Sequence, residues 1–258
     1  FDCDNTLWGG VIGEKGIDGI EISSNTSNGV VYREIQSIAL SLSQQGVILG
    51  LCSKNNPEDV DDVLNNNPNM ILHDKDIAIK KVNWLDKVTN IKSISKELNI
   101  GLDSIGFVDD SLFEVNLVKE YLPDVIVLHV PMKLYEYPQI LRNNLSLFYN
   151  LSNTKEDTNK TEMYRIQAQR EKIKFDFSTL DEYLASLKMC IVIYKNDESL
   201  VPRKSQITQK TNQFNLTTRR YTENEIRSMV LSSDYDIYSF LVKDRFGDSG
   251  ITGLCIIN

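Results

Sequence analysis

The chain has 258 residues and a formal net charge of −8 at neutral pH, with 36 acidic side chains against 28 lysines and arginines. This acidic balance argues against a general nucleic-acid-binding protein, because such proteins present an excess of basic groups. A hydrophobic fraction of 41% is sufficient for a packed core, and the length suits one large domain or two smaller ones.

No apolar stretch approaches the roughly 20 residues that a membrane-spanning helix needs. No signal peptide is recognisable, and we expect a cytoplasmic protein with neither a membrane nor a nucleic acid as its partner. The sequence begins at Phe1 and ends on Cys255-Ile256-Ile257-Asn258, and both ends fall within apolar, strand-like runs. We therefore interpret it as a piece of a longer polypeptide.

The four cysteines lie in or beside apolar runs, at positions 3, 52, 190 and 255. Their spacing is that of neither a metal site nor a disulfide framework. For at least three of them we expect reduced side chains that pack as small hydrophobic groups.

Residues 1–149 alternate apolar, strand-like runs with amphipathic helical runs, as expected for a parallel sheet with crossover helices. Residues 7–28 are rich in glycine and predict a flap or short hairpin over a site. Asn56 and Pro57 have the pattern of a helix start, with Asn56 as the N-cap. The other elements expected in this half are strands over 47–53, 105–110 and 125–130 and helices over 30–45, 90–98 and 116–122.

Residues 150–160 are polar, which predicts a linker between a first domain of residues 1–149 and a second domain of residues 150–258. The elements expected in the second domain are helices over 160–174, 180–187 and 221–231, a strand over 190–194 and an antiparallel pair over 238–242 and 253–257. Helices and antiparallel strands in this order are typical of an α+β domain.

Acidic and hydroxyl side chains gather where the predicted strands of the first half end. Asp2 and Asp4 follow the first strand, Ser53 ends the second, and Asp109 and Asp110 end a third. In an open α/β sheet, ligands bind beyond the carboxyl ends of the strands, so these side chains should converge on one crevice. Oxygen ligands of this kind suit Mg²⁺. We therefore expect Asp2, Asp4, Asp109 and Asp110 to hold Mg²⁺, with Asp4 contributing its backbone oxygen; the alternative for one of the adjacent pair is a helix N-cap.

The same residues indicate phosphoryl chemistry. The Asp2 carboxylate can attack phosphorus, while Asp4 transfers protons. Ser53 is expected to orient a phosphate through its hydroxyl group and the backbone N–H groups that follow it. A lysine can neutralise the phosphate as a point charge, and Lys87 is favoured over Lys80 and Lys81 for this role.

Four motifs arrive in a fixed order: a strand-end aspartate pair, a strand-end serine, a lysine and a strand-end Asp-Asp. The chain resembles the haloacid-dehalogenase-like phosphotransferase superfamily in this respect. Within that superfamily it is similar to the FkbH-type subgroup, both in the first half and in an acyltransferase-like second half. The stretches that carry this resemblance are residues 4–14, 52–56, 83–90, 107–110, 206–221 and 244–250.

The resemblance implies a Rossmann-like parallel sheet of haloacid-dehalogenase type with a small flap, followed by an α+β acyltransferase-like (GNAT-like) domain that looks truncated. It also implies Ser53, Lys54 and Asn55 as substrate-binding residues. The implied activity is Mg²⁺-dependent transfer of a D-glyceryl unit from 1,3-bisphosphoglycerate to the phosphopantetheine thiol of an acyl carrier protein, with dephosphorylation, to start polyketide synthesis. The alternatives are a small-molecule phosphatase without carrier loading and a non-catalytic docking domain.

Cys3 has two possible roles. Glyceryl transfer needs an acceptor, and Cys3 could carry the acyl group as a thioester, together with Asp2, Asp4 and Lys87 as the catalytic set. Strand alternation, however, directs Cys3 away from its two acidic neighbours, so the alternative is a small hydrophobic residue of the core. Cys52 is a weaker candidate for the same chemistry.

Three further groups of polar residues leave alternatives open. His73 and His129 follow or lie in strand-like runs, where we expect structural roles. A polar strip in the second half suits either a buried amide network or a contact with the substrate or carrier, and it consists of Asn212, Gln213, Asn215 and Arg219. A basic patch for an acidic carrier could be formed by Arg203, Lys204, Lys210, Arg219, Arg220 and Arg245.

Overall fold

The computed structural model describes residues 1–148, 160–174, 176–210 and 215–258. The chain divides into two compact units, Phe1–Ala168 and Gln169–Asn258. The boundary between them falls inside helix α8 (Lys160–Lys174). Apart from Lys160, which begins this helix, the predicted linker lies outside the described residues.

The first unit contains two pairs of parallel strands. Strand β1 (Gly50–Ser53) pairs with β2 (Ile79–Val82), and β3 (Gly106–Asp109) pairs with β4 (Ile126–His129). The last three residues of β1 and of β3 are buried, as expected for parallel strands covered on both faces. The prediction of an α/β arrangement with parallel strands is confirmed.

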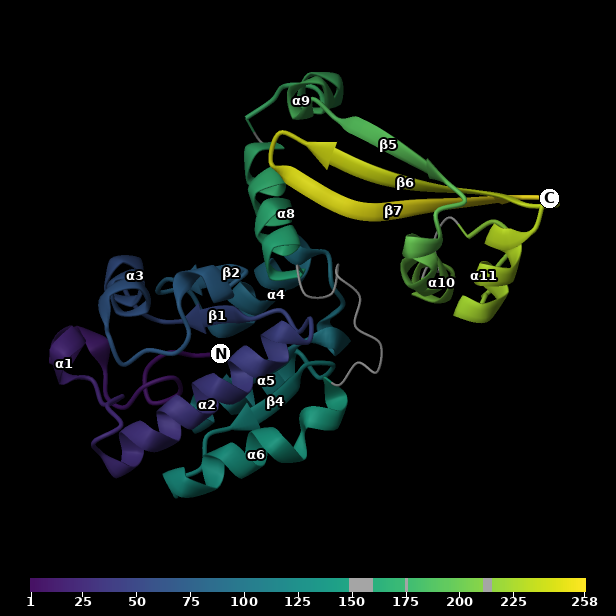
Figure 1. The fold of residues 1–258 in the computed structure, drawn as a ribbon. Coiled ribbons are helices and arrows are strands. Elements are labelled where there is room, and N and C mark those ends of the chain that lie inside the picture. The colour runs from purple at the N-terminus through teal and green to yellow at the C-terminus, as the bar shows by residue number, and fades with distance from the viewer. Residues whose placement is uncertain (149–159, 175, 211–214) are drawn as a thin grey trace. The chain divides into compact units, whose positions relative to one another are not determined.

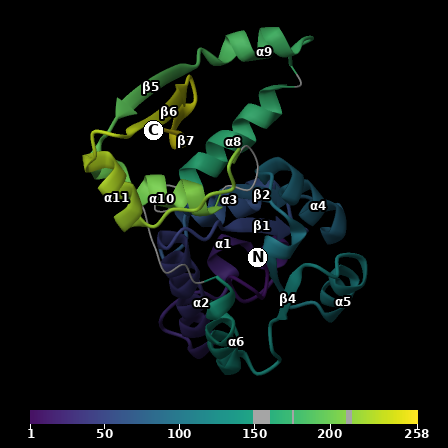
Figure 2. The same ribbon diagram turned by 90° about the vertical axis from the view of Figure 1, so that its right-hand side faces the viewer.

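Phe1 and Asp2 connect the two strand pairs. The amide of Cys52 donates to the carbonyl oxygen of Phe1 at 2.8 Å, and the amide of Asp2 donates to the carbonyl oxygen of Val108 at 2.9 Å. The first residues of the chain therefore lie between β1 and β3, and Figures 1 and 2 both show the N-terminus beside β1. As a result, Asp2 and the last residues of β1 and β3 meet at one edge of the sheet.

Helices surround these strands. Helices α2 and α6 pack against each other, as Figure 1 shows, and α4 contacts both β1 and β2. The helices are α1 (Ile12–Gly19), α2 (Ser27–Gln44), α3 (Pro57–Asn66), α4 (Lys87–Leu98), α5 (Leu112–Tyr121) and α6 (Tyr137–Asn143). Short 3₁₀ turns lie at Asp74–Asp76, Leu102–Ser104, Leu134–Glu136 and Leu145–Leu147.

Side-chain caps start two helices directly after the loops that form the candidate site. The Asp86 carboxylate accepts from the amide of Thr89 and caps α4, and the Ser111 hydroxyl accepts from the amide of Glu114 and caps α5. These caps fix where α4 and α5 begin. They place Lys87 in the first turn of α4 and Asp109 and Asp110 directly before α5.

Some predicted elements of the first unit differ from the structure. The expected hairpin over residues 7–28 is a kinked helix, α1, with an isolated bridge between Gly9 and Glu21. The kink lies at Gly16, whose φ is 67°. The strand expected from residue 47 begins at Gly50, and strand β2, which precedes Lys87, was not predicted.

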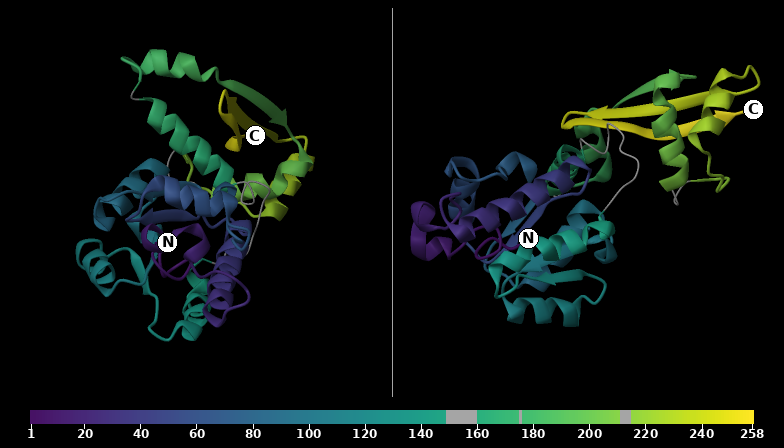
Figure 3. Two further views of the ribbon diagram at one scale, coloured as in Figure 1. Left: turned by 90° about the vertical axis from the view of Figure 1, so that its left-hand side faces the viewer. Right: turned by 60° about the horizontal axis from the view of Figure 1, so that its bottom comes forward.

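The second unit is an α+β arrangement. Strands β5 (Cys190–Lys195), β6 (Asp236–Asp244) and β7 (Gly247–Ile257) form an antiparallel sheet in this order, and Figure 3 shows the two yellow strands β6 and β7 running alongside each other. Its helices include α9 (Leu180–Leu187), α10 (Val201–Lys210) and α11 (Glu223–Leu231). The strands and helices expected here are confirmed, whereas α10 was not predicted.

A small apolar cluster joins α10 and α11 to the sheet of the second unit, and it contains Val201, Ile226, Val230 and Ile237. Within the polar strip predicted in this half, Asn215 and Arg219 are described, while Asn212 and Gln213 lie outside the described residues. Across the described part of the whole chain, no helix has both the length and the apolar character needed to cross a membrane.

Candidate active site

Three carboxylates converge at the edge of the sheet in the first unit. Asp2 lies between β1 and β3, Asp109 is the last residue of β3, and Asp110 follows it. One oxygen of each lies within 4.8 Å of the others. Asp109 is fully buried and Asp2 is 7% exposed. These residues come together because parallel strands present their carboxyl ends at one edge.

A buried lysine lies among these carboxylates. The ammonium nitrogen of Lys87 is 2.8 Å from an oxygen of Asp2 and also pairs with Asp109. Burial alone would lower the pKa of Lys87, but the charges of Asp2 and Asp109 outweigh it and the pKa is raised. Lys87 is therefore a permanent cation held directly against two of the three acidic groups.

The acidic group has the chemistry of a divalent cation site. Burial, followed by the charges of Asp2 and Asp109, raises the pKa of Asp110 to about 6. Burial and the charge of Asp2 likewise raise the pKa of Asp109. Mutual repulsion of this kind is relieved by a hard cation, and three carboxylate oxygens within reach of one another are ligands that Mg²⁺ accepts. The residues present therefore fit Mg²⁺.

The Asp4 carboxylate does not belong to this group of three. One of its oxygens accepts hydrogen bonds from the Trp8 indole at 2.9 Å and the Ile12 amide at 3.1 Å. The other accepts from the side-chain amide of Asn55 at 3.1 Å. Burial raises the pKa of Asp4 even though these hydrogen bonds oppose the shift. A fixed carboxyl group with a raised pKa suits proton transfer, and the metal contact through its backbone oxygen stays a prediction.

The residues expected to bind substrate lie directly after β1. Asn55 donates to the Ser53 hydroxyl at 3.1 Å and so connects Ser53 with Asp4. Lys54 forms an ion pair with Glu114, with its nitrogen 2.6 Å from the nearer carboxylate oxygen. Glu114 is buried, and its second oxygen has no hydrogen-bond partner in the described part of the chain. Glu114 was not predicted, because nothing in the sequence of a helical first turn shows that a glutamate is buried.

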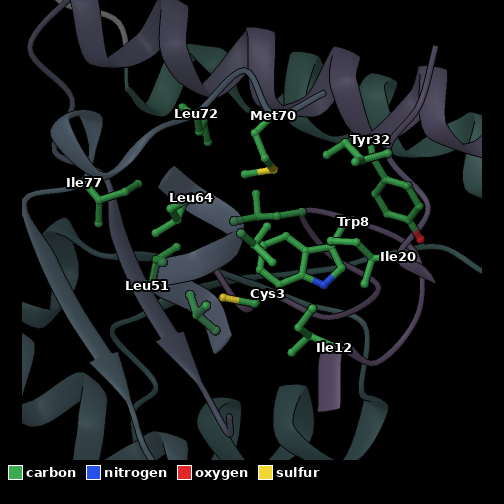
Figure 4. Close-up of a cluster of buried hydrophobic side chains, with 14 of the residues drawn as sticks. Cys3, Trp8, Ile12, Ile20, Tyr32, Leu51, Leu64, Met70, Leu72 and Ile77 are labelled. Carbon is green, nitrogen blue, oxygen red and sulfur yellow. The ribbon is translucent and has the colours of Figure 1, made fainter. Parts of the chain in front are cut away.

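Cys3 lies in the apolar core of the first unit. It is fully buried in a cluster with Trp8, Leu51 and Leu64, and Figure 4 shows its sulfur among apolar side chains. Burial, followed by the charge of Asp2, raises the pKa of its thiol. This burial favours the alternative of a small hydrophobic residue, because a carrier of acyl groups needs an accessible thiolate. Cys52 is also buried, and burial raises its pKa to about 12.

The other candidates have structural contacts. The His73 ring nitrogen lies 3.1 Å from the carbonyl oxygen of Leu64. His129, at the end of β4, has its ring nitrogen 3.0 Å from the carbonyl oxygen of Asp110 and so supports the loop that carries this carboxylate. Lys80 pairs with Asp61 and Asp74, and Lys81 pairs with Glu97. Of the three lysines weighed for the phosphate site, Lys87 is the one among the carboxylates.

No protein-family model matches the chain, and no match is found among curated proteins. Among solved structures, the chain is similar to the crystal structure of the N-terminal part of the protein BF1531 from Bacteroides fragilis, described as containing a phosphatase domain and complexed with Mg. The two share 39% sequence identity with a TM-score of 0.57. The match covers 59% of this chain and 40% of that chain, so the present chain spans about two fifths of its neighbour's length.

Proposed function

We propose that the first unit is a Mg²⁺-dependent phosphatase of the haloacid-dehalogenase type. The observation that carries this proposal is the position of Lys87 between Asp2 and Asp109, beside the third carboxylate of Asp110. Removal of a phosphate group requires a nucleophile and a positive charge that lie close together. Asp2 supplies the nucleophile and Lys87 supplies the positive charge. The similarity to a phosphatase domain complexed with Mg supports the same assignment.

The residues have distinct roles in the proposed reaction. Asp2, Asp109 and Asp110 would hold Mg²⁺, which supplies positive charge to the phosphate oxygens when bound. Asp2 attacks phosphorus, the bond to the ester oxygen breaks, and Asp4 gives its proton to that oxygen. Water then attacks phosphorus and gives a proton to Asp4, and the bond between phosphorus and the Asp2 oxygen breaks, which releases inorganic phosphate and restores both Asp2 and Asp4. Lys87 and Ser53 hold the phosphate during both steps.

Glyceryl transfer from 1,3-bisphosphoglycerate to an acyl carrier protein is the second, narrower candidate. It is favoured by the FkbH-type stretches in both halves of the sequence, including residues 206–221 of the acyltransferase-like (GNAT-like) second half. The burial of Cys3 disfavours a covalent glyceryl intermediate on that residue. This candidate therefore requires either an opening of the core around Cys3 or direct attack by the carrier thiol on the acyl phosphate.

Two assays together distinguish these candidates. The purified chain is mixed with a phosphate monoester such as p-nitrophenyl phosphate, with Mg²⁺ or with a chelator, and phosphate release is followed. The phosphatase proposal predicts Mg²⁺-dependent release without a carrier protein. Loading is tested separately, by the mass of a carrier protein incubated with the chain, Mg²⁺ and 1,3-bisphosphoglycerate. A non-catalytic docking domain would give neither product.

A further inference from the structure

A cavity of about 550 Å³ opens beside the acidic group of the first unit. Asp110 and Asn5 form the part of its wall next to the candidate active site, and Asn28 and Tyr32 contribute from α2. The remaining wall includes Leu112, which is 60% exposed, and Met132, which is fully exposed. Because this cavity adjoins the metal-binding carboxylates, it is the place for the part of a substrate that remains after phosphate is removed.

The wall of this cavity offers hydrogen bonds and apolar contacts but, among the described residues, no lysine or arginine. Its polar side chains are those of Asn5, Asn28, Tyr32, Asp110 and His129, and one ring nitrogen of His129 lies 3.0 Å from the carbonyl oxygen of Asp110. Lys133 follows Met132 in the sequence, but its side chain is 69% exposed and is 3.9 Å from Glu136. An anion placed in this cavity would face Asp110 without a neighbouring lysine or arginine in the described wall.

The charge balance of the surrounding site leads to the same result. Lys87 is shared between two carboxylates, and Lys54 is paired with Glu114. The carboxylates of the region are Asp2, Asp4, Asp109, Asp110 and Glu114, and the ammonium groups are Lys54 and Lys87. With Asp4 protonated for its proposed role as the acid, four carboxylates face two ammonium groups, so one Mg²⁺ brings the region close to neutrality before a substrate binds. One phosphate can be held by the metal and Lys87, but a second anionic group would be uncompensated.

We propose that this site selects phosphate monoesters whose remaining part is uncharged and rich in hydroxyl groups, with an apolar side that packs on Leu112 and Met132. The inference rests on the proposed phosphatase function and names its substrate class. It also separates that function from glyceryl transfer, since 1,3-bisphosphoglycerate carries a second phosphate that this site would repel.

The test uses two substrates that differ in one group. sn-Glycerol 3-phosphate ends in a hydroxymethyl group where 3-phosphoglycerate has a carboxylate. With Mg²⁺ present, kcat/KM is expected to be at least about tenfold higher for glycerol 3-phosphate, which is the scale of repulsion between like charges several ångströms apart at a protein surface. Similar values for the two, or a preference for 3-phosphoglycerate, would overturn the inference and leave the phosphatase assignment intact. Failure of a wider panel of monoesters to release phosphate would instead contradict the phosphatase assignment.

Charge variants test the cause of the selectivity. Met132→Lys places a cation in the cavity wall and is expected to lower the ratio of kcat/KM between the two substrates several-fold, compared with Met132→Gln as the neutral change at the same position. Tyr121→Lys adds the same charge at an exposed position outside the cavity wall and should keep the wild-type ratio. Equal ratios for Met132→Lys and Met132→Gln would show that this cavity does not receive the substrate.

Discussion

The ammonium group of Lys87 lies 2.8 Å from a carboxylate oxygen of Asp2 and pairs at the same time with Asp109. Asp2 lies between β1 and β3, Asp109 ends β3, and Lys87 begins α4 after β2, so a single cation connects three segments of the sheet edge. Without a metal, Lys87 is the group that balances this acidic cluster. The stability and the metal affinity of the first unit therefore depend on the same side chains.

Lys87→Met is expected to destabilise the metal-free protein by about 3 kcal/mol, because it leaves buried carboxylates without their counter-ion. Saturating Mg²⁺ should restore most of this loss, since the metal neutralises the same groups. Chemical denaturation with Mg²⁺ and with a chelator measures both effects. Lys81→Met is the control, because it removes a partly exposed ion pair with Glu97 and should cost less than about 1 kcal/mol. A metal-free Lys87→Met protein as stable as the wild type would contradict the account.

Asp4→Asn is expected to lower kcat by about 10²- to 10⁴-fold, the range for loss of a general acid. Its affinity for Mg²⁺ should change little, because the carboxylate of Asp4 is held by Trp8, Ile12 and Asn55 and is not one of the three clustered carboxylates. Calorimetric titration with Mg²⁺ alongside steady-state kinetics tests this separation. Loss of Mg²⁺ binding in Asp4→Asn would show that its side chain belongs to the metal site.

Much of this site could be predicted from the sequence. The motifs at the strand ends pointed to Asp2, Asp109 and Asp110, and the lysine between the second and third of these motifs pointed to Lys87, because chemistry at the edge of a parallel sheet needs particular residue types in a particular order. The pairing of Lys54 with Glu114 could not be predicted, because it joins residues 60 positions apart through the packing of α5. The cavity beside Asp110 was also not predicted, because α2 and the segment after β4 form it together.

Contacts between distant parts of the chain also decided the elements of the fold that were not predicted. Strand β2 was not predicted because Ile79-Lys80-Lys81-Val82 lacks an apolar run, and its two lysines are satisfied by ion pairs with residues from other elements. Helix α1 was interpreted as a hairpin because its glycines suggested turns. Tertiary contacts of Ile12 and Ile20 with the core decide that conformation instead.

The affinity for Mg²⁺ should fall as the pH drops through about 6. Burial and two neighbouring carboxylates raise the pKa of Asp110 to about 6, so a proton occupies this group at lower pH and competes with the metal. We expect about tenfold weaker binding at pH 5 than at pH 7. In the metal-free protein, pH acts on stability in the opposite direction. Because the pKa of Asp110 is raised in the folded state, its contribution to the free energy of unfolding is largest at low pH, and this contribution is lost as the pH rises through about 6. Titrations of wild type and Asp110→Asn test this, and a pH-independent wild-type affinity would contradict it.

Cys3→Ala is expected to cost roughly 1 kcal/mol of stability through lost packing in the apolar cluster. Phosphate release should stay within about twofold of the wild-type rate, because the buried thiol has no role in the proposed phosphatase reaction. Incubation of the wild-type chain with 1,3-bisphosphoglycerate, followed by peptide mass analysis, should show no acyl group on Cys3. A hydroxylamine-labile adduct on that peptide would show that the core opens and that Cys3 takes part in glyceryl transfer.

The most direct test of the central claim compares Mg²⁺-dependent phosphate release by the wild-type chain, Asp2→Asn and Asp109→Asn on one phosphate monoester. Removing a carboxylate from a mutually repelling group should leave the fold intact, which circular dichroism and thermal denaturation without metal can verify. The account predicts release by the wild type only with Mg²⁺, and a loss of at least about 10²-fold in both variants. Undiminished release by Asp2→Asn, or release by the wild type that a chelator does not reduce, would contradict it.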